Sequence, residues 1–170
     1  ALNAMLLVSY VASRQGDAVG MMTFAGPERW LPPKKSASNV NRFLNSLYDL
    51  QPSTEAADFM QAAEKTKTLL KKRAMVIVLS NLRDEDDEDL HSALKLLRQQ
   101  HLVVFAALKE EVFEKELEAP VENFKDALRY GSLNDYLMHR DTMFEKMHAD
   151  KIIALDVKPQ NLHIELVNRY

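Results

Sequence analysis

The sequence contains no cysteine and only four glycines among its 170 residues. Without thiols, disulfide bonds and cysteine chemistry are excluded, and a reducing cytoplasm is compatible with the composition. So few glycines leave no phosphate-cradling loop, no dinucleotide fingerprint and no nucleophile elbow. The five histidines are scattered, and no two have the three- or four-residue spacing of a helical metal site. We therefore expect a protein that is not an enzyme.

Strong charge of either sign is also missing, because the formal net charge is -3 with acidic and basic residues interspersed. This balance gives no general attraction to nucleic acid or to anionic lipid. The longest uncharged apolar segment, residues 1–13, is shorter than the roughly 20 residues that a membrane-spanning helix needs. We expect no nucleic-acid partner and no membrane contact by this segment.

What the sequence does have is 46% apolar residues, enough for one globular domain over residues 1–170. Apolar runs and helical spacing alternate along the chain. Strands are expected near residues 18–24, 28–33, 75–79, 102–108 and 151–157, and helices near 1–14, 36–50, 56–73, 86–100, after Pro120 through Met147, and from Pro159 onward. Gly131 is a candidate break in the longest of these helices.

Alternating strands and helices predict an α/β fold with a doubly wound, mainly parallel sheet. The segment "ERWLPP" predicts one antiparallel edge strand, since proline is tolerated only at a sheet edge. The first residues already follow a helical pattern, whereas such a sheet normally begins with a central strand. We therefore expect an N-terminally truncated domain that lacks its first central strand.

Several ordered segments carry a family resemblance: "ALNAMLLVSYVASRQGDAVGMMTF", "RWLPPKKSASNVNRFLNSLYDLQP", "EAADF", "MVIVLSNLRD" and "IIALDVKPQNLHIELVNRY". Together they resemble the von Willebrand factor A-like domain of the bacterial family of unknown function that accompanies MoxR-type AAA+ ATPases. The similarity covers essentially the whole chain. It implies a Rossmann-like fold and a role in protein interaction.

The resemblance also implies a metal-ion-dependent adhesion site, whose Asp-x-Ser-x-Ser strand would lie upstream of Ala1. Two other loops complete that site in the family, and both depart from the pattern here. Ala57 stands where a Ser or Thr precedes the Asp, with Thr54 three places too early, and Asn81 replaces an Asp. Magnesium prefers anionic oxygens in octahedral geometry, and a neutral amide or a methyl group cannot supply them. We expect a degenerate site without a metal cofactor.

Ligands of open α/β sheets gather beyond the carboxyl ends of the strands. That rule predicts a polar partner-binding rim, and six residues are candidates for it: Thr54, Asp58, Ser80, Asn81, Asp84 and Asp86. The acidic run after Asn81 also suits the positive end of a helix dipole. The resemblance implies that the partner is a MoxR-type AAA+ ATPase acting in the assembly or maturation of another complex. It further implies a cytoplasmic location, with a tether to the inner membrane outside this chain.

Three alternatives stay open. Asp84 and Asp86, with an upstream strand, could complete a functional magnesium-dependent adhesion domain. A hydrolase or transferase on a similar α/β frame is the second, although no nucleophile motif supports it. The third concerns assembly. The missing central strand would leave a gap in the sheet with unpaired backbone groups. A swapped segment could fill the gap, the strands near Val19 and Val76 could pair directly, or the chain could self-associate as a homo-oligomer.

Overall fold

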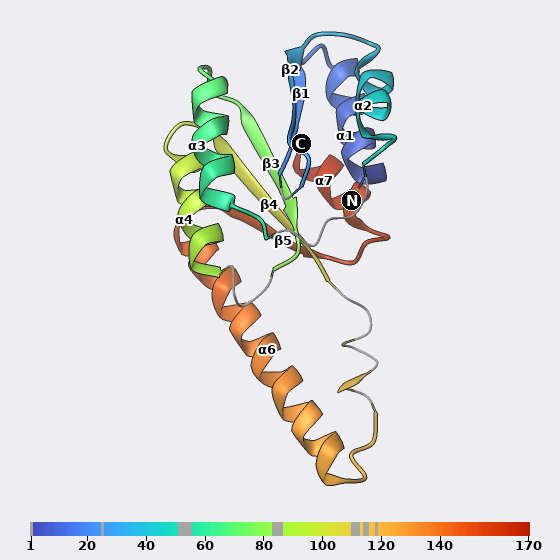
Figure 1. Cartoon of the computed structure of the whole chain (residues 1–170), viewed down its shortest axis with the longest axis vertical. Helices are drawn as coiled ribbons and strands as arrows, with labels where there is room; N and C mark the ends of the chain where they lie inside the picture. Colours follow the sequence, from blue (N-terminus) through green and yellow to red (C-terminus); the bar gives the residue numbers. More distant parts are fainter. Residues whose placement is uncertain are drawn as a thin grey trace. The chain divides into compact units, whose positions relative to one another are not determined.

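The computed structural model describes residues 2–24, 26–50, 56–82, 87–109, 113, 116–117 and 119–170. The helices and strands follow one another as α1 (Leu2–Arg14), β1 (Val19–Thr23), β2 (Arg29–Lys34), α2 (Asn39–Leu47), α3 (Phe59–Leu69), β3 (Met75–Ser80), α4 (Asp87–Arg98), β4 (Leu102–Leu108), α6 (Phe124–Ala149), β5 (Ile153–Val157) and α7 (Leu162–Arg169). The predicted α/β class is confirmed (Figure 1).

The chain divides into two compact units, and each is described by itself. Unit 1 is Ala1–Ala62 with Gln160–Tyr170, and unit 2 is Ala63–Pro159.

Unit 1 is built on the antiparallel β1–β2 pair, with α1 packed against α7, α2 and β1. Its core is formed by Met21 of β1 and by Phe43 and Leu47 of α2, which are buried. The four-residue spacing of Phe43 and Leu47 places both side chains on one face of α2. Burial of this face stabilises a helix that is too short to be stable alone.

Gly20 explains how a strand with two prolines can pair with β1. Pro32 and Pro33 lie within β2, and the register shifts there, so that Val19 pairs with Lys34 but Met21 pairs with Leu31. This irregularity brings the β2 backbone close to Gly20. A Cβ at Gly20 would lie 2.8 Å from the Leu31 carbonyl oxygen, which is closer than real Cβ atoms approach. The glycine is therefore required by the close approach of the two strands.

Unit 2 contains a parallel sheet in the order β3-β4-β5. In its register, Val76 pairs with Val103 and Phe105 pairs with Ala154. The central strand β4 has an unbroken apolar run and is buried from Val103 to Ala107, whereas β3 is half-buried throughout. Right-handed connections between successive parallel strands place their helices on the same face. Accordingly α4 packs on β4 and α6 on β5, and both lie on one side of the sheet (Figure 1).

Three details differ from the sequence-based expectations. The antiparallel strands β1 and β2 form a sheet of their own, while β3 hydrogen-bonds to β4 in the other sheet. Pairing near Val19 and Val76 is therefore not among the ladders of the described strands. Gly131 does not break α6, which runs unbroken for 26 residues. A helical glycine costs only about 1 kcal/mol relative to alanine, and packing of the rest of the helix outweighs that cost. Finally, α7 begins at Leu162, after a turn that contains Pro159.

Candidate functional site

The carboxyl ends of the three parallel strands are joined by side chains from α6. The inward face of this helix carries the buried residues Leu133, Arg140, Met143 and Met147 at three- to seven-residue spacing. Arg140 is thus a cation on an otherwise apolar stripe, and only 4% of it is exposed. A buried guanidinium must be paired, because leaving its charge unpaired away from water is very costly.

Asp156 of β5 provides that pair by a two-point contact. Arg140 Nη2 donates to Asp156 Oδ1 at 2.6 Å, and Arg140 Nε donates to Oδ2 at 3.2 Å. Nη2 also lies 3.4 Å from the Leu108 carbonyl at the end of β4, and Nη1 lies 3.3 Å from the Tyr136 hydroxyl. The Tyr136 hydroxyl in turn donates to the Leu82 carbonyl, two residues beyond β3, at 3.2 Å. One guanidinium therefore links the ends of all three strands.

The charge of Arg140 is held in place by these contacts. Burial by itself lowers the pKa of the guanidinium. The hydrogen bond and the negative charge of Asp156, together with Tyr136, raise the pKa by more than burial lowers it, so the pKa lies above the ordinary value. The guanidinium is also 5.6 Å from the centre of the Phe144 ring, close enough for a cation–π interaction. Arg140 therefore remains charged at every physiological pH, and its charge is neutralised within the protein.

Two of the predicted rim residues lie at this end of the sheet. Ser80 is the last residue of β3 and is half-buried, and Asn81 follows it and is exposed. Leu82 is buried and fixes the chain beyond them. The structure therefore places Ser80 and Asn81 at the carboxyl end of β3, and their role in binding a partner stays a prediction. Asp84 and Asp86 lie outside the described residues.

An acid–histidine pair lies at the start of the helix that follows. Asp87 opens α4 and is only 5% exposed, and its Oδ2 is 3.3 Å from His139 Nε2 of α6. A carboxylate in the first turn of a helix is stabilised by the positive end of the dipole. This structural role agrees with the expectation that the acidic run serves the helix start.

The remaining predicted rim residues belong to unit 1. Asp58 precedes α3, and its Oδ1 accepts a hydrogen bond from the Gln61 backbone N–H at 2.8 Å. Such a bond is a helix N-cap, which satisfies one of the free N–H groups of the first turn. Ala57 is half-buried, and Thr54 lies outside the described residues.

The described residues do not fit a magnesium site in either unit. Asn81 brings a neutral amide, Ala57 brings no side-chain oxygen, and the Asp58 carboxylate caps its own helix. Over the described ranges, no group of three or more His, Asp or Glu side chains is placed to hold a metal ion. Magnesium binds through hard, anionic oxygens, and these positions do not provide a set of them.

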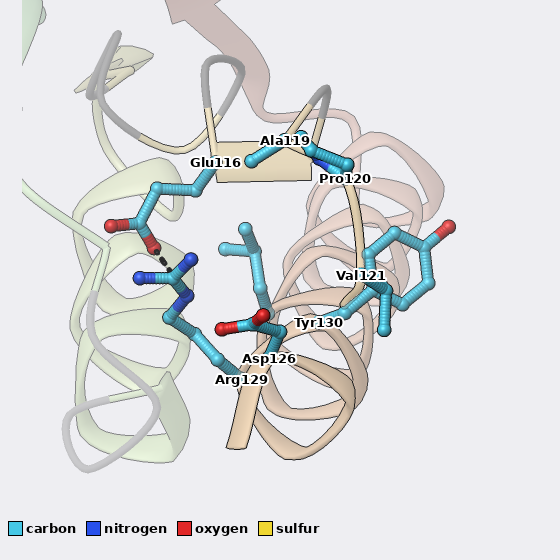
Figure 2. A pocket seen from close by; sticks show the side chains of 8 residues that line it. Glu116, Ala119, Pro120, Val121, Asp126, Arg129 and Tyr130 are labelled. Atoms are coloured by element: carbon cyan, nitrogen blue, oxygen red, sulfur yellow. Dashed lines mark ion pairs between the residues drawn. The ribbon is translucent and has the colours of Figure 1, made fainter. Parts of the chain in front are cut away.

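A small hollow lies at the other end of α6, near its first turns. Figure 2 shows its lining residues: Glu116, Ala119, Pro120, Val121, Asp126, Arg129, Tyr130 and Leu133. An ion pair crosses it, with Arg129 Nε 3.9 Å from Glu116 Oε2 and both side chains well exposed. The hollow is partly open to solvent, and the space that it encloses is far smaller than that of a ligand pocket. Ligand pockets are generally larger and more enclosed, so we do not assign it a substrate.

One protein-family model matches most of the chain. The model described as protein of unknown function DUF58 matches residues 1–127, about three quarters of the sequence. The chain belongs to the DUF58 family. The match to DUF58 runs from α1 into the first turns of α6 and so includes Asp58, Ser80 and Asn81. No curated protein and no solved structure matches the sequence. Within the described part of this DUF58 chain, no helix is both long enough and apolar enough to cross a membrane.

The pair Arg140 and Asp156 was not predicted from the sequence, although two signals were available. Asp156 interrupts the last apolar strand, "IIALDV", and Arg140 falls on the apolar stripe of its helix. Each is a charged residue at a position where the local pattern demands an apolar one. Opposite charges at two such positions indicate a buried pair.

Proposed function

We propose that this chain is a non-catalytic protein-interaction domain of the von Willebrand factor A type, and that its recognition surface is the carboxyl end of the parallel sheet. Recognition there depends on shape and on polar side chains, among them Asn81, Asp84 and Asp86, and no metal ion is needed. The proposed partner is a MoxR-type AAA+ ATPase that assembles or matures another complex in the cytoplasm.

One observation carries this proposal: the buried charge of Arg140 at the carboxyl end of the sheet is already paired with Asp156. Arg140 is used on Asp156, Tyr136 and the Leu108 carbonyl, so its positive charge is not available to a phosphate or carboxylate substrate. Among the described residues that directly follow β3, Ser80 and the exposed Asn81 carry no charge. A polar surface whose buried charge is already paired supports binding of a protein better than turnover of a small molecule.

The likeness to the von Willebrand factor A domains, noted for the ordered segments of the sequence, is the support for the choice of partner. In open α/β folds the carboxyl end of the sheet is the usual place for a ligand. Family membership adds no function, since DUF58 is defined only as a family of unknown function. The ATPase is therefore a hypothesis that a binding experiment must decide.

The test is capture of the MoxR-type ATPase by the immobilised chain. We expect Asn81→Arg, which places a bulky cation on the proposed surface, to weaken capture at least tenfold. Reversing the charges of Asp84 and Asp86 together is expected to weaken it as well. Lys72→Glu is the matched control, because Lys72 is exposed and precedes the opposite, amino end of the same strand.

Capture that is equally strong for Asn81→Arg and for the unchanged chain, with circular dichroism showing both folded, would contradict the proposed surface. Repeating the capture with a chelator tests the metal-dependent alternative. We expect no change, because the positions available for ligands supply a neutral amide and a methyl group. Loss of binding on chelation, restored by magnesium, would instead favour a functional adhesion site.

A further inference from the structure

Helix α6 has two apolar faces, and only one of them is used within unit 2. The inward face carries Leu133, Met143 and Met147, which are buried. Successive residues of an α-helix are rotated by about 100°. Phe124, Leu128 and Met138 therefore lie within an arc of about 80° on the opposite side. These three side chains are 78%, 57% and 62% exposed. We call this exposed stripe, together with Gly131, the outer face of α6.

Gly131 lies in the middle of the outer face, and nothing within the protein requires it. A Cβ built at Gly131 meets no atom within 4 Å, and its backbone is helical. Glycine in a helix interior is less stable than alanine by about 1 kcal/mol. This cost is understandable if another backbone approaches closely there, as small residues permit at helix crossings.

The outer face is complementary to itself about Gly131. Phe124 lies seven residues before Gly131, and Met138 lies seven residues after it. Two copies of α6 that run antiparallel and cross at Gly131 would place Phe124 of each copy against Met138 of the other. Sulfur and aromatic rings attract one another favourably, and symmetric dimers use the same patch twice.

Two charges support the same arrangement: Asp135 lies within the arc of the outer face, and Lys125 lies about 60° outside it. In such a crossing, Lys125 of one copy is about 3 Å along the axis from Asp135 of the other, on the same side of the helix pair. Both residues are exposed. The two-fold axis repeats this opposite-charge pair, so the contact gains two of them. The antiparallel direction also aligns the helix dipoles favourably.

We propose that the chain forms a two-fold symmetric dimer through the outer face of α6, with the helices antiparallel and Gly131 at the crossing. The occupant of the exposed stripe is thus a second copy of the chain. This interface goes beyond the proposed ATPase surface, which lies at the carboxyl end of the sheet and does not depend on it.

The decisive experiment is site-specific cross-linking, for which the cysteine-free sequence is suited. Under mild oxidation, Gly131→Cys is expected to form a disulfide-linked dimer, since the two positions face each other at the axis. Phe124→Cys alone is expected to remain unlinked, because its two copies lie about 21 Å apart along the helices. Mixing Phe124→Cys with Met138→Cys is expected to give the linked heterodimer.

Sedimentation of the 170-residue chain over a concentration series gives the second test. We expect a mass that approaches twice that of one chain, and a dissociation constant at least tenfold weaker in Gly131→Leu and in Phe124→Lys. Tyr48→Lys is the matched control, since Tyr48 of unit 1 is a similarly exposed aromatic at 83% and lies outside the stripe. Lys125→Asp is expected to weaken the dimer, and Asp135→Lys on the same chain to restore it.

A chain that stays monomeric at every concentration, with Gly131→Cys unlinked, overturns the proposal. Linking of Phe124→Cys to itself overturns the antiparallel register. A dimer that Gly131→Leu leaves intact, or that Tyr48→Lys weakens equally, locates the contact elsewhere and rejects the outer face. Circular dichroism on each variant shows that it is folded, so that every result bears on the interface.

Discussion

The two halves of α6 show how one helix can serve two different environments. From Leu133 onward the helix carries the buried side chains of Leu133, Arg140, Met143 and Met147, and Arg140 joins the strand ends through Asp156. In the first turns, Phe124 and Leu128 are mostly exposed. The difference indicates that the first half is stabilised by continuity with the second and is available for contact with another molecule.

The largest contrast between the two faces is expected for two methionines of this helix. Met147 is fully buried, so Met147→Ala should leave a cavity and destabilise the fold by about 3 kcal/mol. Met138 is 62% exposed, and Met138→Ala should change the unfolding free energy by less than about 0.5 kcal/mol. Urea denaturation of dilute samples measures both. Equal losses in the two variants would show that the faces are not distinct.

Removing Asp156 should have the next largest effect, because Arg140 would be left buried with its charge unpaired. We expect Asp156→Ala to cost about 2 to 3 kcal/mol, somewhat less than for a fully buried pair, since the Asp156 side chain is 30% exposed. Replacing Arg140 and Asp156 together by leucine should recover most of this loss. Thermal unfolding checks both variants, and a double variant less stable than Asp156→Ala would contradict the explanation.

A smaller effect of opposite sign is expected at Gly131. Because a Cβ there meets no atom of the protein, Gly131→Ala should stabilise the dilute chain by about 1 kcal/mol through helix propensity alone. Ser132→Ala, at the neighbouring exposed position, is the control and should give less than half of that gain. Destabilisation by Gly131→Ala in a dilute sample would mean that the glycine has a role within the fold.

The smallest effect is a dependence on pH at the C-terminal end of α6. Asp150 lies 3.3 Å from Lys95 and 2.8 Å from His91 of α4. The hydrogen bond from Lys95, followed by that from His91, holds the pKa of Asp150 below its ordinary value of 3.8. The folded state therefore favours the charged carboxylate, so this contribution is complete above pH 3.8 and is lost as the pH falls below it.

Asp150→Asn should accordingly reduce the difference in stability between pH 6 and pH 3. Asp141→Asn, an exposed carboxylate on the same helix, is the matched control and should leave that difference nearly unchanged. Denaturant midpoints at the two pH values measure the effect. An unchanged pH dependence in Asp150→Asn would show that the contacts with Lys95 and His91 do not contribute.

Local patterns were sufficient to predict the strands and most helices. The continuous apolar run from Leu102 to Leu108 predicted a strand, which the structure shows to be the central one of unit 2, and the two prolines of "RWLPPK" predicted an edge strand. Gly131, a candidate break, does not interrupt α6, because helix propensity is a weak preference that packing overrides. Local patterns also did not show that β1 and β2 form a sheet of their own, since pairing between distant strands depends on the whole fold.

The candidate site was predicted only in part. Ser80 and Asn81 were chosen as candidates because they directly follow a clear strand, whereas Arg140 and Asp156 become neighbours only when α6 packs on β5. Their attraction is a property of the folded sheet and not of either segment. Asp58 was assigned to a metal-site loop, but in the structure its carboxylate caps α3. Any Asp that precedes a helix can perform this role.

The most direct test of the division within α6 is amide hydrogen exchange on a dilute sample of the chain. We predict that amides from Leu133 to Ala149 exchange slowly, with protection close to that of β4, and that amides from Leu128 to Ser132 exchange much faster. Raising the concentration should protect the faster group selectively. Uniform slow exchange from Leu128 through Ala149 in the dilute sample would contradict the account.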